Sequence, residues 1–403
     1  MAFNEASFRR GAPTPLACVM GGMDLVRPLG LAGLHCAVVA RPGSPSLYSR
    51  FTHATFCRDD FSEHDDDLVQ ALARFGAAQP EPPVLFYEED AQLLLVSRYR
   101  QRLARTLRFA IADSELVENL VDKSRFYSLA ERLHLPVPPT RKIDPAAAVP
   151  AHLDLRFPIV IKPLTRSPAW DVIADSHKAL EVASPAALQA LWPRLAGLGR
   201  DLLAQELVPG TEACIESYHV YVDRTGRIAG EFTGRKIRTY PTVCGHSTAL
   251  EISDAADVRA HGRAAVEKLG LEGVAKLDFK RAPDGRLHLL EINPRFNLWR
   301  HLGAIAGVNL PAMVYADLVG LPRPRRQTAR VGMRWCSVWK DLPAARASGV
   351  SLSRWLPWML ACEAKSAVAW DDPMPLLRSV LFHLARRAAR GTAVPFQLHK
   401  QAG

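Results

Sequence analysis

The chain has 403 residues, more than a single compact core usually organises, so two or three domains are expected. Its composition, with 48% hydrophobic and 23% charged residues, is typical of a soluble globular protein. A net charge of +10 suits an anionic small molecule as well as nucleic acid. No RNA-binding signature, Cys/His finger or basic–aromatic platform accompanies that charge, so no nucleic-acid partner is expected.

The cysteines and the N-terminus indicate the compartment. The seven cysteines are scattered, odd in number and without C-x-x-C spacing, which favours free thiols in a reducing environment over zinc or disulfides. The first residues, "MAFNEASFRRGAPTP", contain no apolar signal-peptide core, and no segment reaches the roughly 18 apolar residues of a membrane span. A cytoplasmic protein is expected.

The first predicted unit is a βαβ motif over residues 16–40, with Gly33 just past the end of its helix. The turn Gly21–Gly22 raises the question of a dinucleotide site. However, the G-x-G-x-x-G pattern is absent, and Arg41 follows the second strand where an acidic residue would be needed. An open α/β sheet without a dinucleotide is therefore predicted.

A further strand, "PVLFYEED", ends in Glu88, Glu89 and Asp90. The carboxyl ends of parallel strands are where open α/β sheets bind ligands, so these acidic groups are candidates for a substrate ammonium. A solvated loop is the equally good alternative.

The middle of the chain mixes helices and strands without a βαβ rhythm, which predicts an α+β second domain. A helix at 122–133 begins with Asp122 in the capping position and ends at consecutive prolines. Strands are predicted at 157–164 and 201–210, with helices at 184–195 and 255–269.

From residue 321 a Pro/Arg-rich connector leads to a C-terminal extension that ends in a predicted helix at 371–391. One face of this helix is apolar and the other carries arginines. The apolar positions are 377, 380, 381, 384, 385 and 388, and the arginines are Arg378, Arg386, Arg387 and Arg390. The helix could rest on an anionic membrane surface or an acidic carrier protein. The favoured interpretation is a helix packed on the core of the middle domain, with its arginines in solvent near its C-terminus.

The stretch 274–293 carries the strongest chemical signal. It predicts a hairpin in which a two-residue turn, Asp284–Gly285, places Asp278 directly opposite Glu291. A four-residue loop would keep both carboxylates on one face, whereas a three-residue loop would separate them. Asn293 shares the face of Glu291 because side chains alternate along a strand.

Two adjacent carboxylates and an amide oxygen suit Mg²⁺ that also binds phosphate oxygens, with Mn²⁺ as the alternative. The competing interpretation pairs the carboxylates with Lys276, Lys280 or Arg286. Lys162 favours the ligand, because an ammonium inside an apolar strand needs an anionic partner.

At this point the sequence resembles the ATP-grasp superfamily over residues 120–312. The resemblance rests on "DKSRFYSLAERLHLPVPPT", "PIVIKPL", "QELVPG" and "LDF…EINPR". Within the superfamily the chain is most similar to the predicted carboxylate–amine ligase branch that includes D-aspartate ligase, through "GRKIRTYP" and "EINPRFNLWRHLGAIAGVNLPAMVYADL".

The resemblance implies a domain plan and a set of roles. The plan is an α/β domain at 1–113, an ATP-grasp domain at 114–320 with a lid at 157–209, and a mostly helical extension at 321–403. Lys123 and Lys162 would contact the ATP phosphates, together with Lys178. Glu206 and the backbone of Leu207 and Val208 would hold adenine, with Gln205 beside them, and Glu212 would hold the ribose. Asp278, Glu291 and Asn293 would bind Mg²⁺, and Arg295, Lys236 and Arg238 would stabilise the phosphoryl group and the acyl-phosphate.

The implied activity is ATP-dependent ligation of a small-molecule carboxylate to an amine through an acyl-phosphate. Alternatives are an ATP-grasp kinase or carboxylase-type enzyme, or an inactive nucleotide-binding scaffold. Proteins of this kind are often homodimers. One departure concerns the lid, because "KPLTRSPAWDVIADSHKAL" contains no glycine. Arg166 and Lys178 are expected to replace a glycine-rich phosphate loop by side-chain charge.

Overall fold

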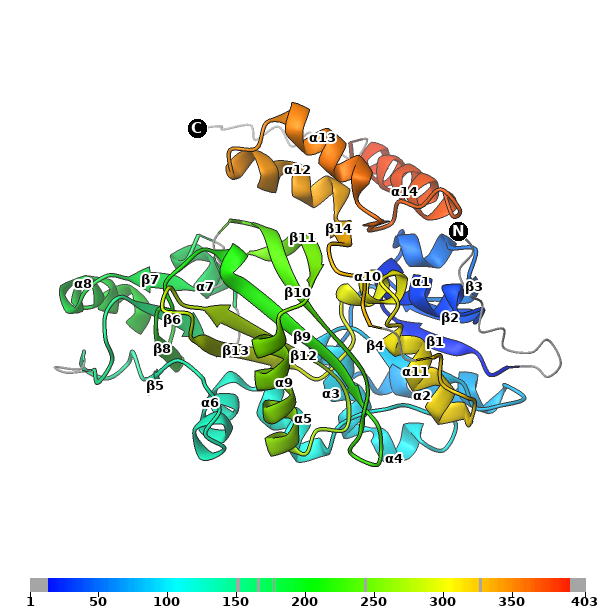
Figure 1. Cartoon of the computed structure of the whole chain (residues 1–403), viewed down its shortest axis with the longest axis horizontal. Helices are drawn as coiled ribbons and strands as arrows, with labels where there is room; N and C mark the ends of the chain where they lie inside the picture. Colours follow the sequence, from blue (N-terminus) through cyan, green and yellow to red (C-terminus); the bar gives the residue numbers. More distant parts are fainter. Residues whose placement is uncertain are drawn as a thin grey trace, which may run out of the picture.

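The computed structural model describes residues 14–149, 153–164, 167–175, 177, 179–242, 245–325 and 328–391. Three sheets follow one another along the chain, and the helices of the C-terminal extension lie together along one edge of the molecule (Figure 1).

The first sheet is parallel and has the strand order β3-β2-β1-β4. Its strands are β1 (Ala17–Met20), β2 (Cys36–Ala40), β3 (Thr52–Cys57) and β4 (Val84–Tyr87). Its helices and those that follow are α1 (Met23–Leu31), the 3₁₀ turn η1 (Pro45–Tyr48), α2 (Asp66–Ala77), α3 (Asp90–Arg98), α4 (Arg100–Leu103) and α5 (Ser114–Val121). The predicted βαβ motif is confirmed, with Gly33 at φ +81° just past α1. Because β2 and β4 flank β1, the strand order reverses at the carboxyl ends of β1 and β4, where such sheets bind ligands.

The second sheet is small and antiparallel, in the order β5-β8-β6-β7. It follows helix α6 (Lys123–Arg132), whose first turn is capped by the Asp122 carboxylate as predicted. The strands are β5 (Thr140–Ile143), β6 (Ile159–Pro163), β7 (Leu180–Val182) and β8 (Leu202–Glu206), with helices α7 (Pro168–Ile173) and α8 (Pro185–Ala196). This unit has a hydrophobic cluster of its own, centred on Ile161, Trp170 and Leu195.

The third sheet has seven strands in the order β13-β12-β9-β10-β11-β14-β15. They are β9 (Ile215–Val222), β10 (Ile228–Tyr240), β11 (His246–Ser253), β12 (Gly273–Arg281), β13 (Leu287–Asn293), β14 (Arg334–Cys336) and β15 (Ala364–Lys365). Two glycines let helices approach the sheet closely. A Cβ on Gly262 of α9 (Ala256–Leu269) would collide with Tyr218, and one on Gly234 would collide with Trp299 of α10 (Trp299–Ile305). Helix α11 (Leu310–Val319) packs beside α10.

The C-terminal extension contains α12 (Val338–Ala347), α13 (Leu352–Ala361) and α14 (Met374–Gly391). Its two short strands, β14 and β15, extend the central sheet. The predicted packing of the last helix is wrong in one respect. The α14 helix lies on the turn before η1, in the first domain, where Ser379 donates to the Gly43 carbonyl. Its apolar stripe is exposed and does not pack on the middle domain. The side chains of Arg386, Arg387 and Arg390 lie outside the described residues.

Within the described part of the chain, no single helix is long and apolar enough to cross a membrane.

Candidate active site

The hairpin of β12 and β13 does pair Asp278 with Glu291, as predicted. The turn prediction was wrong, because the Ala282 amide donates to the Arg286 carbonyl and closes a three-residue loop. Gly285 adopts φ +86° at the end of that loop, a backbone conformation that favours glycine.

A three-residue loop alone would have placed the two carboxylates on opposite faces. The strands compensate with a β-bulge, since Phe279 pairs with Leu289 while Asp278 pairs with Glu291. Leu290 is therefore the extra residue, which restores the facing of every residue that follows it.

Asp278 is fully enclosed by polar partners. Ser217 donates to its Oδ1 at 2.5 Å, and Lys276 Nζ lies 2.7 Å from its Oδ2. Lys236 Nζ lies 3.3 Å from the same oxygen. Burial opposes ionisation of Asp278, but the two ammonium groups outweigh it and hold the pKa of this carboxyl below its usual value. Asp278 is therefore a carboxylate at neutral pH.

A cavity of about 270 Å³ opens beside Asp278, between the second and third sheets. Seven of the predicted site residues line it: Lys123, Lys162, Glu212, Lys236, Asp278, Glu291 and Asn293. The Lys123 ammonium donates to the Pro163 carbonyl at 2.7 Å, and that of Lys162 donates to Gln205 Oε1 at 2.7 Å. Residues from β6, α6, β10 and the β12–β13 hairpin thus meet in one place, with cations facing carboxylates.

The structure separates Gln205 from Glu206. Gln205 is buried and faces Lys162, whereas the Glu206 carboxylate accepts from Arg156 Nε and Nη2 at 3.1 and 2.8 Å. Glu206 does not line the cavity, and the Leu207 amide already donates to the Pro158 carbonyl at 3.0 Å. Val208 is buried and also lies outside the cavity lining. Gln205 also lies outside the cavity lining, but its side chain contacts the cavity residue Lys162.

Arg295 joins the hairpin to the first sheet. Its Nε donates to Asp90 Oδ1 at 2.5 Å, its Nη1 to the Glu88 carbonyl at 2.8 Å, and its Nη2 to Asn293 Oδ1 at 3.2 Å. The Glu88 carboxylate accepts from the Gly22 amide at 2.7 Å. The carboxyl ends of β1 and β4, the expected ligand edge of the first sheet, therefore lie beside the cavity.

Arg238 has a different environment from Lys236. Its guanidinium forms a bidentate pair with Asp341 of α12, at 2.9 and 2.6 Å, and lies 4.0 Å over the ring of Trp358. The β10–β11 pairing is irregular between Lys236 and Arg238. The structure therefore directs Arg238 to the C-terminal extension, and it does not line the cavity.

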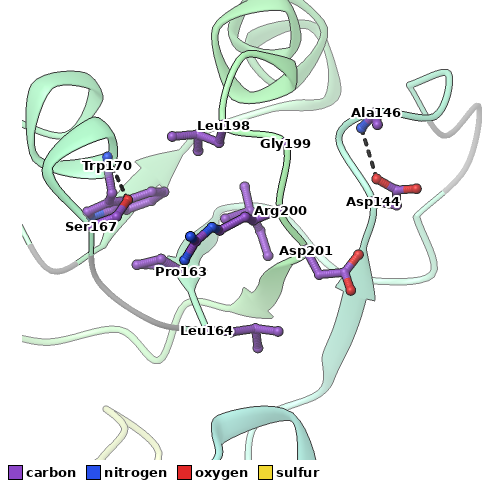
Figure 2. Close-up of a pocket in the computed structure, with 11 residues that line it drawn as sticks. Asp144, Ala146, Pro163, Leu164, Ser167, Trp170, Leu198, Gly199, Arg200 and Asp201 are labelled. Carbon is purple, nitrogen blue, oxygen red and sulfur yellow. Dashed lines mark hydrogen bonds between the residues drawn. The ribbon is translucent and has the colours of Figure 1, made fainter. Parts of the chain in front are cut away.

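Lys178 and Arg166, the expected substitutes for a glycine loop, lie outside the described residues. A second cavity of about 410 Å³ lies within the second sheet's own unit (Figure 2). Figure 2 shows the Arg200 guanidinium extending into it towards Pro163. Asp278 and Glu291 contribute nothing to its lining, so the chemistry indicated by the hairpin belongs to the first cavity.

Two residues near the site were missed by sequence reasoning. Ser217 reaches Asp278 because β9 pairs with β12 at that position, a partnership without any local signal. Arg300 is 1% exposed, and its Nε and Nη1 atoms have no hydrogen-bond partner among the described residues. Burial, with the nearby charge of Arg295, lowers the pKa of Arg300 to about 9.

The donor set fits a magnesium ion that is shared with phosphate oxygens. Asp278 and Glu291 both direct an oxygen at one cation, the Lys276 ammonium, at 2.7 and 3.4 Å. No group of three or more His, Cys, Asp or Glu side chains in the described residues is arranged to hold a metal by itself. Two carboxylates are too few for a dedicated protein cage, and they suit Mg²⁺ whose remaining ligands come from a nucleotide and water.

The chain is similar to known proteins in part of its sequence and in its fold. Residues 200–339 match the family described as ATP-grasp in the biosynthetic pathway with Ter operon. D-aspartate ligase from Enterococcus faecium (strain Aus0004) is 25% identical over 240 residues, which span 57% of this chain and 57% of that relative.

Solved structures share the fold over most of the chain. N5-carboxyaminoimidazole synthetase from Staphylococcus aureus superposes with a TM-score of 0.59 at 13% identity, covering 83% of each chain. L-amino acid ligase from Bacillus licheniformis gives a TM-score of 0.56 at 13% identity, covering 77% of this chain and 75% of that one. At such identities the structural likeness shows the fold alone. Together with the family match over residues 200–339, it shows that the chain has an ATP-grasp fold.

Proposed function

We propose that the protein is an ATP-dependent carboxylate–amine ligase that forms an amide bond through an acyl-phosphate. The observation that carries this proposal is the single cavity in which Lys123, Lys162 and Lys236 face Asp278 and Glu291. Lysines and paired carboxylates that line one cavity suit a polyphosphate that arrives with a divalent metal ion.

The position of each side chain suggests its role. Lys123 and Lys162 would bind the phosphates, Gln205 would orient Lys162 through its 2.7 Å hydrogen bond, and Glu212 would hold the ribose. Asp278, Glu291 and Asn293 would hold magnesium, which when bound neutralises charge on the phosphate oxygens.

Phosphoryl transfer to the substrate carboxylate needs charge stabilisation rather than covalent help from the protein. Lys236, which lines the cavity, and Arg295, which lies at its edge beside Asp90, would stabilise the charge on the transferring phosphoryl group. The amine would then attack the acyl-phosphate, phosphate would leave, and Arg295 would stabilise the tetrahedral oxyanion.

Water must be excluded because it hydrolyses an acyl-phosphate. We propose that the unit at 157–209 closes over the cavity as a lid within the 114–320 domain. The hydrophobic cluster of the second sheet, which also includes Ile143 of β5, would allow that sheet and its helices to move as one body. The domain limits of this proposal are those predicted from the sequence, namely 1–113, 114–320 and 321–403.

The edge at β1 and β4 is the proposed substrate end of the cleft. Glu88 and Asp90 supply carboxylates there, while Arg295 and Arg300 supply guanidinium groups. A substrate that carries both an ammonium and a carboxylate, as amino acids do, would find both counter-charges at this edge.

The test is a screen for ADP release with amino acids and dicarboxylates supplied in pairs, followed by mass spectrometry of the products. Ligation requires both an acid and an amine and yields a product that has lost one water relative to the pair. A phosphorylated product without an amine would indicate a kinase. Bicarbonate-dependent ADP release would indicate a carboxylase, and no nucleotide turnover under any pairing would favour a scaffold.

A further inference from the structure

The charge of the chain is divided very unevenly between its parts. Residues 1–320 contain 37 Lys and Arg against 37 Asp and Glu, so this part is formally neutral. Residues 321–403 contain 14 Lys and Arg against 4 Asp and Glu, which gives +10. The whole net charge of the protein therefore resides in the C-terminal extension, away from the hairpin that binds the proposed nucleotide.

The same extension exposes a row of apolar side chains on α14. Leu377, Leu381 and Leu384 are 53%, 64% and 56% exposed, and Val380 lies between them at 42%. The spacing of three and four residues places these side chains on one face of the helix.

The opposite face of α14 is the one that holds it to the protein. Ser379 is buried and donates to the Gly43 carbonyl at 2.8 Å. A Cβ on Gly43 would collide with the ring of Phe382, so that ring lies directly on the turn. Residues 379 and 382 thus fix the helix, and its leucine face is directed outwards.

Helix α13 repeats this arrangement. Leu352, Leu356 and Leu360 recur every four residues and are all exposed. The inward side is fixed by Trp355, whose Nε1 donates to the buried Asp341 at 2.8 Å. Trp370, in the segment before α14, is 97% exposed. Figure 1 shows α12, α13 and α14 along the same edge of the molecule.

We propose that this edge docks on an anionic lipid surface, with the exposed leucines entering the boundary between headgroups and acyl chains. Helices that combine a leucine face, exposed tryptophan and positive charge have the composition of interfacial amphipathic helices. Basic residues near an anionic leaflet add electrostatic attraction.

Charge decides between the partners that an apolar face could have. Residues 338–391, which contain the three helices, carry eight Lys and Arg against four Asp and Glu, so a second copy would bring the same positive excess, and like charges oppose such a dimer. A lipid surface also needs no matching shape, which suits side chains that project from two separate helices. An acidic protein would share the charge but requires a complementary surface.

The experiment is vesicle flotation of the full chain, with phosphatidylcholine alone or mixed with phosphatidylglycerol, at low and high salt. Binding is expected only to the anionic vesicles and should weaken as salt screens the charge. The triple variant Leu377→Glu, Leu381→Glu, Leu384→Glu should reduce partitioning at least about tenfold, since each exposed leucine loses its transfer energy. All three positions are exposed, so the fold is expected to survive.

The matched control places glutamates at exposed apolar positions elsewhere, Leu31→Glu and Val172→Glu, which should bind vesicles as the wild type does. No binding to anionic vesicles at low salt would overturn the proposal, as would equal binding by the triple variant. Retention on polyglutamate without vesicle binding would assign the face to an acidic protein instead. A dimer that the triple variant dissociates would assign it to a second copy.

Discussion

Lys276 and Asp278 form an ion pair of 2.7 Å on the same face of β12, and the same ammonium lies 3.4 Å from Glu291. A positive charge thus stands between the two carboxylates that are proposed to bind magnesium. The sequence offered a metal ion and a lysine as competing partners for these carboxylates. A metal ion bound by both carboxylates would take the position of the lysine, so the two would be alternative occupants.

The two carboxylates should respond differently to neutralisation. The Glu291 side chain is 56% exposed, so Glu291→Gln should leave the free energy of unfolding nearly unchanged. ATP turnover should fall at least about 100-fold, because a metal ligand is lost from the phosphate site. Thermal unfolding and ADP release measure the two effects. Glu272→Ala, a change at an exposed glutamate distant from the cavity, is the control. Retained turnover in the Glu291 variant would contradict the metal assignment.

Asp278→Asn should destabilise the protein as well as inactivate it. Asp278 is 1% exposed and pairs with Lys236 and Lys276, so the substitution removes the ion pair of Lys236 and leaves Lys276 with its longer contact to Glu291. The cost of breaking such a buried pair is about 3 kcal/mol. The pKa of Asp278 lies below its usual value, so its contribution is complete above the unfolded pKa, near 3.8, and is lost as the pH falls below that value. Denaturant unfolding of both proteins at pH 7 and at acidic pH tests this. A constant difference across that range would argue against the charge explanation.

Gln205 and Glu206 give a third prediction, because adjacent residues of a strand face opposite sides. Gln205→Ala should raise the Michaelis constant for ATP roughly tenfold by releasing Lys162, whereas Glu206→Ala should leave that constant within about twofold of the wild type. Steady-state kinetics of both variants provide a matched comparison. The reverse order would show that Glu206 turns into the cavity when nucleotide binds.

Asp24 should make stability depend on pH near neutrality. It accepts from Trp335 Nε1 at 2.8 Å, and burial, with the charge of Glu88, raises its pKa to about 7. The folded protein therefore holds a proton on Asp24 that the unfolded chain releases near pH 3.8, so stability falls as the pH rises from about 4 to 7 and then levels off. Asp24→Asn keeps an acceptor for Trp335 without the charge.

The melting temperature of the Asp24→Asn variant, relative to the wild type, should accordingly increase over that interval and stay constant above it. Differential scanning fluorimetry at a series of pH values measures the difference. A flat difference from pH 4 to pH 8 would mean that Asp24 ionises normally in the folded protein.

The sequence predicted those parts of the site that depend on local periodicity. Asp278 and Glu291 were placed together because strands alternate with period two and because a turn between them was evident. The predicted turn is wrong, and Asp278 and Glu291 share a face only because Leu290 forms a bulge. Nothing in the sequence distinguishes this leucine from others in strands. The sequence also did not predict which side of β8 faces the cavity. Strand alternation places Gln205 and Glu206 on opposite sides but does not show which of them is directed towards it.

Contacts between residues that are far apart in the sequence could not be predicted either. Arg238 was expected at the phosphoryl group, yet it pairs with Asp341, which lies 103 residues later. The partner of Arg238 depends on how the C-terminal extension folds back onto the third sheet. The sequences of β10 and α12 contain no pattern that predicts this contact.

The bulge at Leu290 changes what one strand can present to a ligand. Leu290, the extra residue of the bulge, lines the cavity beside Glu291. One edge of the cavity therefore joins an apolar contact to an ionic one within a single residue step. Sequence length is consequently constrained unevenly along this hairpin. A change of length within the exposed loop at 283–285 leaves the carboxylates in place as long as Ala282 still pairs with Arg286, whereas deletion of Leu290 would reverse the facing of Glu291 and Asn293.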